Sequence, residues 1–209
     1  MKNIVVIGAG TMGNGIAHVF AQNGFETTLN DLNESQLQKA KATILNNLDR
    51  LLSKEKISEE LKIKTLGRLQ FATQANRAIK QADLIIEAAT ENFEIKKKIF
   101  NDVMPIAPSH CVFATNTSSI SIDRLARQIP NPERLIGMHF FNPVPVMQLV
   151  EIIKGEKTTS EVTKKTEELT LKLNKTGVVV NDAPGFISNR ILMPMVNEAV
   201  EALSQGVAV

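Results

Sequence analysis

The chain has 209 residues, of which 43% are hydrophobic and 22% charged, and its formal net charge is +2. This composition is typical of a globular α/β protein, and the weak charge and the lack of Trp and Tyr argue against a nucleic-acid partner. The single cysteine, Cys111, excludes an intrachain disulfide and suits a reducing compartment, so we expect a cytoplasmic location. The first residues read as a strand, and no apolar run is long enough to span a bilayer, so we expect neither a signal peptide nor a membrane partner.

Short apolar segments alternate with helical patterns along most of the chain. Strands are predicted at residues 3–7, 26–29, 69–71, 83–87, 112–115, 135–138, 149–153 and 177–180. Helices are predicted at residues 12–22, 33–53, from 58 onward, 92–104, 120–128, 159–173 and 186–205. This alternation predicts an α/β fold with a Rossmann-type, doubly wound, mostly parallel sheet that has helices on both faces.

The dipeptide Pro184-Gly185 is the clearest boundary signal in the second half of the chain. We therefore expect a nucleotide-binding domain over residues 1–183 and the start of a second, helical domain over residues 184–209. The helix predicted over 186–205 has an apolar face that no later segment of this chain covers. We expect the chain to self-associate through this helix, as a homodimer or another oligomer.

A glycine-rich loop follows the first predicted strand and reads Gly8-Ala9-Gly10-Thr11-Met12-Gly13. Its first glycine permits a tight turn, the second lets the backbone approach a pyrophosphate, and the third lets the helix pack close to the strand. Asp31 ends the second predicted strand, where a carboxylate accepts hydrogen bonds from the ribose hydroxyls of NAD and repels the 2′-phosphate of NADP. The sequence therefore predicts NAD as the cofactor.

Polar side chains also follow later strands, at the edge of the sheet where ligands bind in such folds. They are found at residues 87–91 and 116–119, at His139 and at Glu151. A neutral imidazole can take the proton of an alcohol as its hydride leaves, and a carboxylate on the other ring nitrogen fixes the tautomer. Glu151 is the nearest downstream carboxylate that could serve His139. No cluster of His and Cys has metal-ligand spacing, so we expect no catalytic metal.

Five motifs occur together in this order: GAGTMGNGIA, EAATEN, ATNTSS, GMHFFNPVPVMQLVEII and DAPGFISNRIL. With them the chain resembles the L-3-hydroxyacyl-CoA dehydrogenases, most of all their bacterial 3-hydroxybutyryl-CoA branch. The resemblance implies an NAD-dependent oxidoreductase of fatty acid metabolism. It would oxidise an L-3-hydroxyacyl-CoA to the 3-ketoacyl-CoA, or run the reverse reaction. It also implies that residues 184–209 are the truncated start of a helical dimerisation domain.

The same resemblance implies roles for single residues. His139 and Glu151 would form the acid/base pair, Ser118 would bind the substrate oxygen near the nicotinamide, and Asn189 would help to place the substrate carbonyl. Glu91, Lys96 and Asn142 would contact the cofactor, and Arg50 and Lys54, with Lys56 nearby, would meet the CoA moiety. Two alternatives stay open: a dehydrogenase of 3-hydroxy acids without CoA, and a fragment that binds NAD or dimerises without catalysis.

Overall fold

A computed structural model describes residues 1–207 of the chain. Its strands are β1 (Asn3–Ile7), β2 (Glu26–Asn30), β3 (Leu69–Ala72), β4 (Leu84–Glu87), β5 (Val112–Thr115), β6 (Leu135–Phe140), β7 (Leu149–Lys154) and β8 (Thr176–Asn181). Its helices are α1 (Thr11–Gln22), α2 (Glu34–Ser53), α3 (Glu59–Gly67), α4 (Asn76–Ile79), α5 (Phe93–Val103), α6 (Ile122–Ala126), α7 (Ser160–Lys172) and α8 (Ser188–Ser204), with a 3₁₀ turn over Pro132–Arg134.

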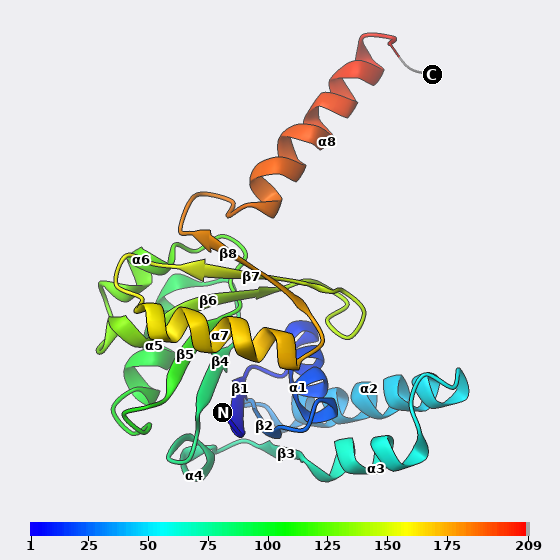
Figure 1. The fold of residues 1–209 in the computed structure, drawn as a ribbon, viewed down its shortest axis with the longest axis vertical. Coiled ribbons are helices and arrows are strands. Elements are labelled where there is room, and N and C mark those ends of the chain that lie inside the picture. The colour runs from blue at the N-terminus through cyan, green and yellow to red at the C-terminus, as the bar shows by residue number, and fades with distance from the viewer. Residues whose placement is uncertain (208–209) are drawn as a thin grey trace.

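The eight strands form one sheet in the order β3-β2-β1-β4-β5-β6-β7-β8 (Figure 1). All neighbouring strands are parallel except β6 and β7, which are antiparallel. The chain leaves β1 toward one edge and returns to pair β4 with the other side of β1. This reversal opens a crevice at the carboxyl ends of β1 and β4, where nucleotides bind in doubly wound folds. The predicted fold class is confirmed.

The two faces of the sheet carry separate apolar layers. Ile4 and Val6 of β1 belong to a cluster that includes buried residues of α1, α2 and α7. Val5 and Ile7 point to the opposite face and join a cluster with residues of α5 and α6. This alternation, in which both faces are apolar, is typical of strands that are covered by helices on both sides.

Most helix boundaries follow from capping side chains. The side chains of Asn33, Ser58, Asn92, Ser121 and Thr159 each accept a backbone hydrogen bond at the start of a helix. Among the longer helices of the described residues, α1 and α8 have no such side chain of their own. Both helices begin at the candidate site described below.

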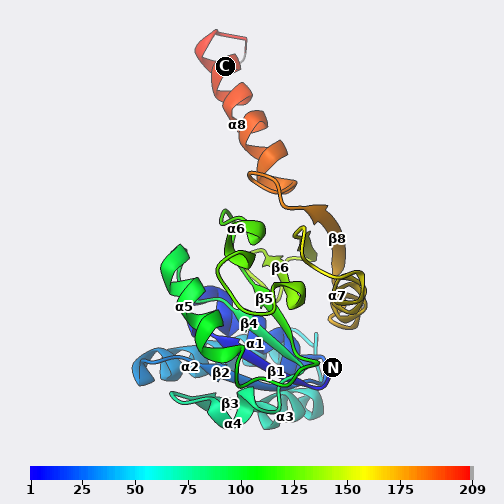
Figure 2. The same ribbon diagram turned by 90° about the vertical axis from the view of Figure 1, so that its left-hand side faces the viewer.

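The structure differs from the predictions in a few elements. The helix predicted over 120–128 covers only Ile122–Ala126, and the single turns α4 and Pro132–Arg134 were not predicted. Elements of three to five residues are too short to show a helical period in the sequence. In the described residues no helix is long and apolar enough to cross a membrane. Helix α8 projects away from the sheet and has no buried residue (Figures 1 and 2).

Candidate active site

The glycine loop joins β1 to α1 at the crevice. A Cβ atom at Gly13 would lie 1.7 Å from the carbonyl oxygen of Gly8, and one at Gly8 would lie 2.6 Å from that of Ala88. These two glycines are therefore required by packing. Gly10 is different, since a Cβ there would meet no atom within 4 Å. The open space above Gly10 and the uncapped start of α1 fit the pyrophosphate of a dinucleotide.

Asp31 lies beside this loop, directly after β2. Its Oδ2 accepts a hydrogen bond from the backbone N–H of Ala9 (2.8 Å), and its Oδ1 accepts one from the N–H of Asn33 (2.9 Å). The carboxylate is thus held at the edge of the glycine loop, and the side chain is only half-buried. This position suits a ribose hydroxyl of NAD, as the sequence predicts.

His139 and Glu151 form a buried pair. His139 is the fifth residue of β6 and Glu151 the third of β7, and the antiparallel register sets them directly opposite each other. His139 Nδ1 lies 2.6 Å from Glu151 Oε2. Burial raises the pKa of Glu151, but hydrogen bonds from His139 and from the backbone of Ser188 outweigh burial, and the pKa lies below its usual value. Glu151 is therefore an anionic partner for the imidazole.

Glu91 organises the loop that carries Ser118. Its Oε1 accepts hydrogen bonds from the hydroxyl of Thr117 (2.6 Å) and from the backbone N–H groups of Ser118 and Ser119 (both 3.0 Å). These bonds lower the pKa of Glu91 although partial burial raises it. Asn189, in the first turn of α8, donates from Nδ2 to the carbonyl of Ser118 at 3.4 Å. The four site residues predicted around the reacting carbon thus come from β6, β7, the loop after β5 and α8.

Lys96 is almost fully buried, and its charge is neutralised within the protein. Its ammonium group donates to both oxygens of Glu87, at 2.9 and 2.8 Å, and lies 3.5 Å from Glu91 Oε2. Glu87 also accepts hydrogen bonds from Thr115 and from the backbone of Ala89. The sequence places Glu87 at a strand end but indicates no role for it. A charged residue at the end of an otherwise apolar strand is the feature of the sequence that could have indicated a buried ion pair.

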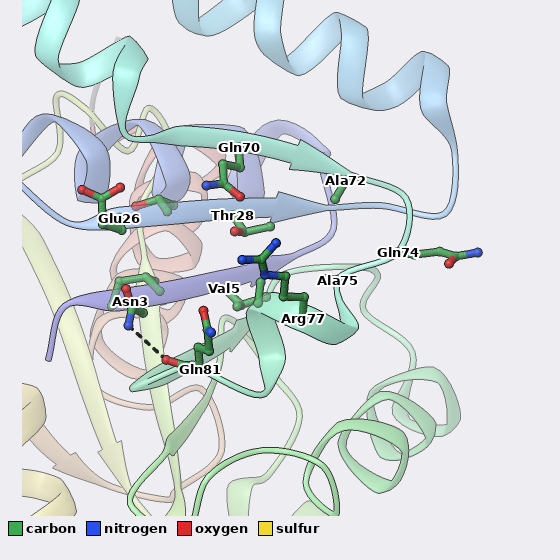
Figure 3. A pocket seen from close by; sticks show the side chains of 13 residues that line it. Asn3, Val5, Glu26, Thr28, Gln70, Ala72, Gln74, Ala75, Arg77 and Gln81 are labelled. Carbon is green, nitrogen blue, oxygen red and sulfur yellow. Dashed lines mark hydrogen bonds between the residues drawn. The ribbon is translucent and has the colours of Figure 1, made fainter.

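A pocket of about 410 Å³ joins these features at the carboxyl edge of the sheet. The predicted residues that line it are Gly10, Thr11, Met12, Glu91, Lys96, Ser118, His139 and Asn142. Cofactor-binding and catalytic candidates therefore share one continuous space. A second hollow of about 320 Å³ lies toward the amino ends of β1 and β2, next to α4 (Figure 3). Its lining, which includes Arg77 and Glu26, contains none of the predicted site residues.

Arg50 and Lys54 lie at the carboxyl end of α2, outside the lining of the pocket. Both are exposed, and Arg50 donates to the side chain of Asn47 at 3.4 Å. Their role toward CoA remains a prediction. In the described residues no group of His, Cys, Asp and Glu side chains is arranged to hold a metal ion.

Known proteins match the chain over its whole length. The family described as 3-hydroxyacyl-CoA dehydrogenase, NAD binding domain, matches residues 3–183. A 3-hydroxybutyryl-CoA dehydrogenase of Bradyrhizobium diazoefficiens is 46% identical over 207 residues, which are 99% of this chain and 70% of that protein.

Solved structures show the same similarity. The crystal structure of (S)-3-hydroxybutyryl-CoA dehydrogenase from Ralstonia eutropha has a TM-score of 0.95 and 44% identity, and the match covers 100% of this chain and 73% of that one. A 5-formyl-3-hydroxy-2-methylpyridine 4-carboxylic acid 5-dehydrogenase has a TM-score of 0.89 and 32% identity, over 100% of this chain and 67% of that one. The chain belongs to the 3-hydroxyacyl-CoA dehydrogenase family and contains its NAD-binding domain.

Proposed function

We propose that this protein is an NAD-dependent dehydrogenase that oxidises L-3-hydroxyacyl-CoA, such as 3-hydroxybutyryl-CoA, to the 3-ketoacyl-CoA, or catalyses the reverse reduction. One observation carries the proposal. The His139–Glu151 pair lines or adjoins the same pocket as the uncapped start of α1, so an acid/base group and a dinucleotide site meet at one place. The names of the relatives support the same substrate class.

The chemistry that bound NAD would supply is acceptance of a hydride from the carbon that bears the substrate hydroxyl. Residues Gly8 to Gly13 would hold the pyrophosphate with backbone N–H groups, and Asp31 would accept hydrogen bonds from a ribose. Glu91, Lys96 and Asn142 would hold the nicotinamide half, because all three line the pocket beyond the glycine loop. The buried Glu87 accepts two hydrogen bonds from the ammonium group of Lys96, which would fix the position of Lys96 in this wall of the pocket.

His139 would act as general base in the oxidation. Because Nδ1–H donates to the anionic Glu151, Nε2 keeps its lone pair and can take the hydroxyl proton. The carboxylate then stabilises the imidazolium, and the same proton returns to the oxygen in the reverse direction. Ser118 would hydrogen-bond the reacting oxygen, and Asn189 would orient the thioester carbonyl. The loop and helix that carry these two residues are tied together at the carbonyl of Ser118.

A CoA thioester is the favoured substrate because Arg50, Lys54 and Lys56 offer cations for its phosphates. The test compares NADH oxidation with acetoacetyl-CoA and with free acetoacetate. We expect turnover with the thioester only. Turnover with free acids alone would favour the alternative without CoA, to which the pyridine carboxylate dehydrogenase of the same fold lends support. Tight NADH binding without any turnover would instead support a binding function and contradict catalysis.

We also propose that residues 1–183 form the NAD-binding domain and that residues 184–209 begin a helical domain. Helix α8 exposes Ile191, Met195, Val196 and Leu203, each at least 48% accessible, which supports self-association of this chain through residues 186–205. Analytical ultracentrifugation at increasing concentration should show dimers or larger species, and a constant monomer would contradict this.

A cytoplasmic role in fatty acid metabolism fits the buried thiol of Cys111 and the acyl-CoA substrate.

A further inference from the structure

The turn between β8 and α8 has an unusual backbone. Gly185 and Phe186 are consecutive residues in the left-handed region, with φ values of 79° and 49°. Glycine adopts this conformation freely, but a bulky aromatic residue rarely does. Residues held this way persist only where the surrounding structure imposes the conformation. The surrounding structure therefore imposes the left-handed conformation on Phe186.

Packing supplies that constraint. Phe186 is only 4% exposed and belongs to the apolar cluster under α5 and α6. Its ring centroid lies 6.0 Å from that of His139. The residues that follow are far more open, since Ile187 is 40% exposed and α8 buries no residue. Phe186 is thus the last buried side chain before α8 in the described residues. Helix α8 itself projects away from the domain (Figure 1).

The buried Phe186 lies directly before the backbone that contacts the carboxylate of Glu151. The backbone N–H groups of Ile187 and Ser188 donate to Glu151 Oε1 at 3.0 and 2.7 Å. Helix α8 has no capping side chain of its own, so Glu151 caps it from another element. The other oxygen of Glu151 receives the hydrogen bond of His139. One buried carboxylate therefore joins the helix start to the imidazole.

We infer that Phe186 is a positioning residue for the reaction proposed above. By holding the left-handed turn, it keeps the start of α8 on Glu151, and Glu151 in turn keeps His139 in the Nδ1–H tautomer with Nε2 open to substrate. The inference rests on the proposed function, because that function gives the pair of His139 and Glu151 a role in catalysis. Beyond that function, the position of the start of α8 controls the tautomer of His139 and the pKa of Glu151.

The experiment uses the full chain and the variants Phe186→Ala and Phe186→Leu, with Leu171→Ala, an exposed apolar residue of α7, as the control. Long-range ¹H–¹⁵N NMR reports the tautomer of His139 without substrate, and ¹³C NMR of the Glu151 carboxyl reports its pKa. Phe186→Ala should move His139 toward a mixture of tautomers and raise the pKa of Glu151, because the two backbone donors are lost. Phe186→Leu should give smaller changes in the same direction, and Leu171→Ala should give none.

Kinetics of the same variants complete the test. Phe186→Ala should lower kcat with acetoacetyl-CoA by on the order of tenfold while the NADH affinity stays unchanged. An unchanged tautomer and an unchanged Glu151 pKa in both folded Phe186 variants would overturn the inference. So would a tautomer shift without a change at Glu151, since water entry alone would then explain it. If the NMR changes occur but the parent chain shows no turnover, the proposed function fails and the coupling stands.

Discussion

Replacing Glu151 by Gln tests the acid/base assignment with almost no change in shape. The carboxylate is fully buried, lies 2.6 Å from His139 Nδ1 and accepts two backbone N–H groups with its other oxygen. The Gln oxygen can still accept those two N–H groups. Its amide, however, donates toward Nδ1, which forces the imidazole proton onto Nε2, the atom that must accept the substrate proton.

The magnitude follows from two losses. The hydrogen bond to a charged group is worth about 1.5–3 kcal/mol, and the imidazolium formed during turnover loses its counter-charge as well. Together these losses amount to roughly 3–5 kcal/mol of transition-state stabilisation, which corresponds to a fall in kcat of about 10²–10⁴-fold. NADH affinity should not change, because Glu151 does not line the cofactor part of the pocket.

The assay is acetoacetyl-CoA-dependent oxidation of NADH, with NADH affinity measured separately by fluorescence. Glu167→Gln on α7 is the control, since it removes the same charge from an exposed position. Circular dichroism at the assay temperature shows that each variant is folded. Turnover of folded Glu151→Gln within twofold of the parent would refute the assignment of Glu151 as the partner that fixes the tautomer of His139.

Three further predictions test the cofactor site and the core. Gly13→Ala should lower the free energy of unfolding by about 3 kcal/mol and weaken NADH binding, because its Cβ would lie 1.7 Å from the carbonyl oxygen of Gly8. Urea unfolding measures this loss, with Gly67→Ala as the control because a Cβ there would meet no atom within 4 Å, and equal stabilities of the two variants would contradict the prediction. Asp31→Ala should raise the Kd for NADH by about tenfold and reduce the preference for NADH over NADPH. An unchanged ratio of the two Kd values would show that Asp31 does not contact the ribose. His18 is buried, and among the described residues neither ring nitrogen has a hydrogen-bond partner, so burial lowers its pKa to about 4. The unfolded chain binds that proton near pH 6.5 and the folded one only near pH 4, so stability falls as the pH drops through this window, by on the order of 2 kcal/mol from pH 7 to pH 5. Chemical denaturation of His18→Leu at both values should show this loss reduced, and an equal loss would assign it to other groups.

The fold and the cofactor loop could be predicted because their signals are local. Apolar runs mark the strands, and the glycines at 8 and 13 are required by atoms of the adjoining strands and loops. The pairing of His139 with Glu151 could be suspected from the sequence but not established. It depends on an antiparallel register between β6 and β7, across an eight-residue loop whose geometry the sequence does not specify.

Contacts between distant elements were harder still to predict. Glu87 neutralises Lys96 across β4 and α5, and Glu151 caps a helix that begins 37 residues later. Nothing in the local sequence around Ser188 indicates that a carboxylate from another strand replaces its missing cap. The sequence shows that α8 lacks a capping residue of its own, but only the structure shows that Glu151 of β7 lies beside the start of α8 and takes this role.

In the proposed function, His139 performs the proton transfer of an NAD-dependent hydroxyacyl-CoA dehydrogenase. The most direct measurement is kcat for acetoacetyl-CoA reduction by the parent chain and by His139→Ala, with the NADH affinity of both determined alongside. We predict measurable turnover in the parent, a fall of about 10²–10⁴-fold in the variant, and equal NADH affinities. Equal turnover in the two proteins would contradict this role of His139.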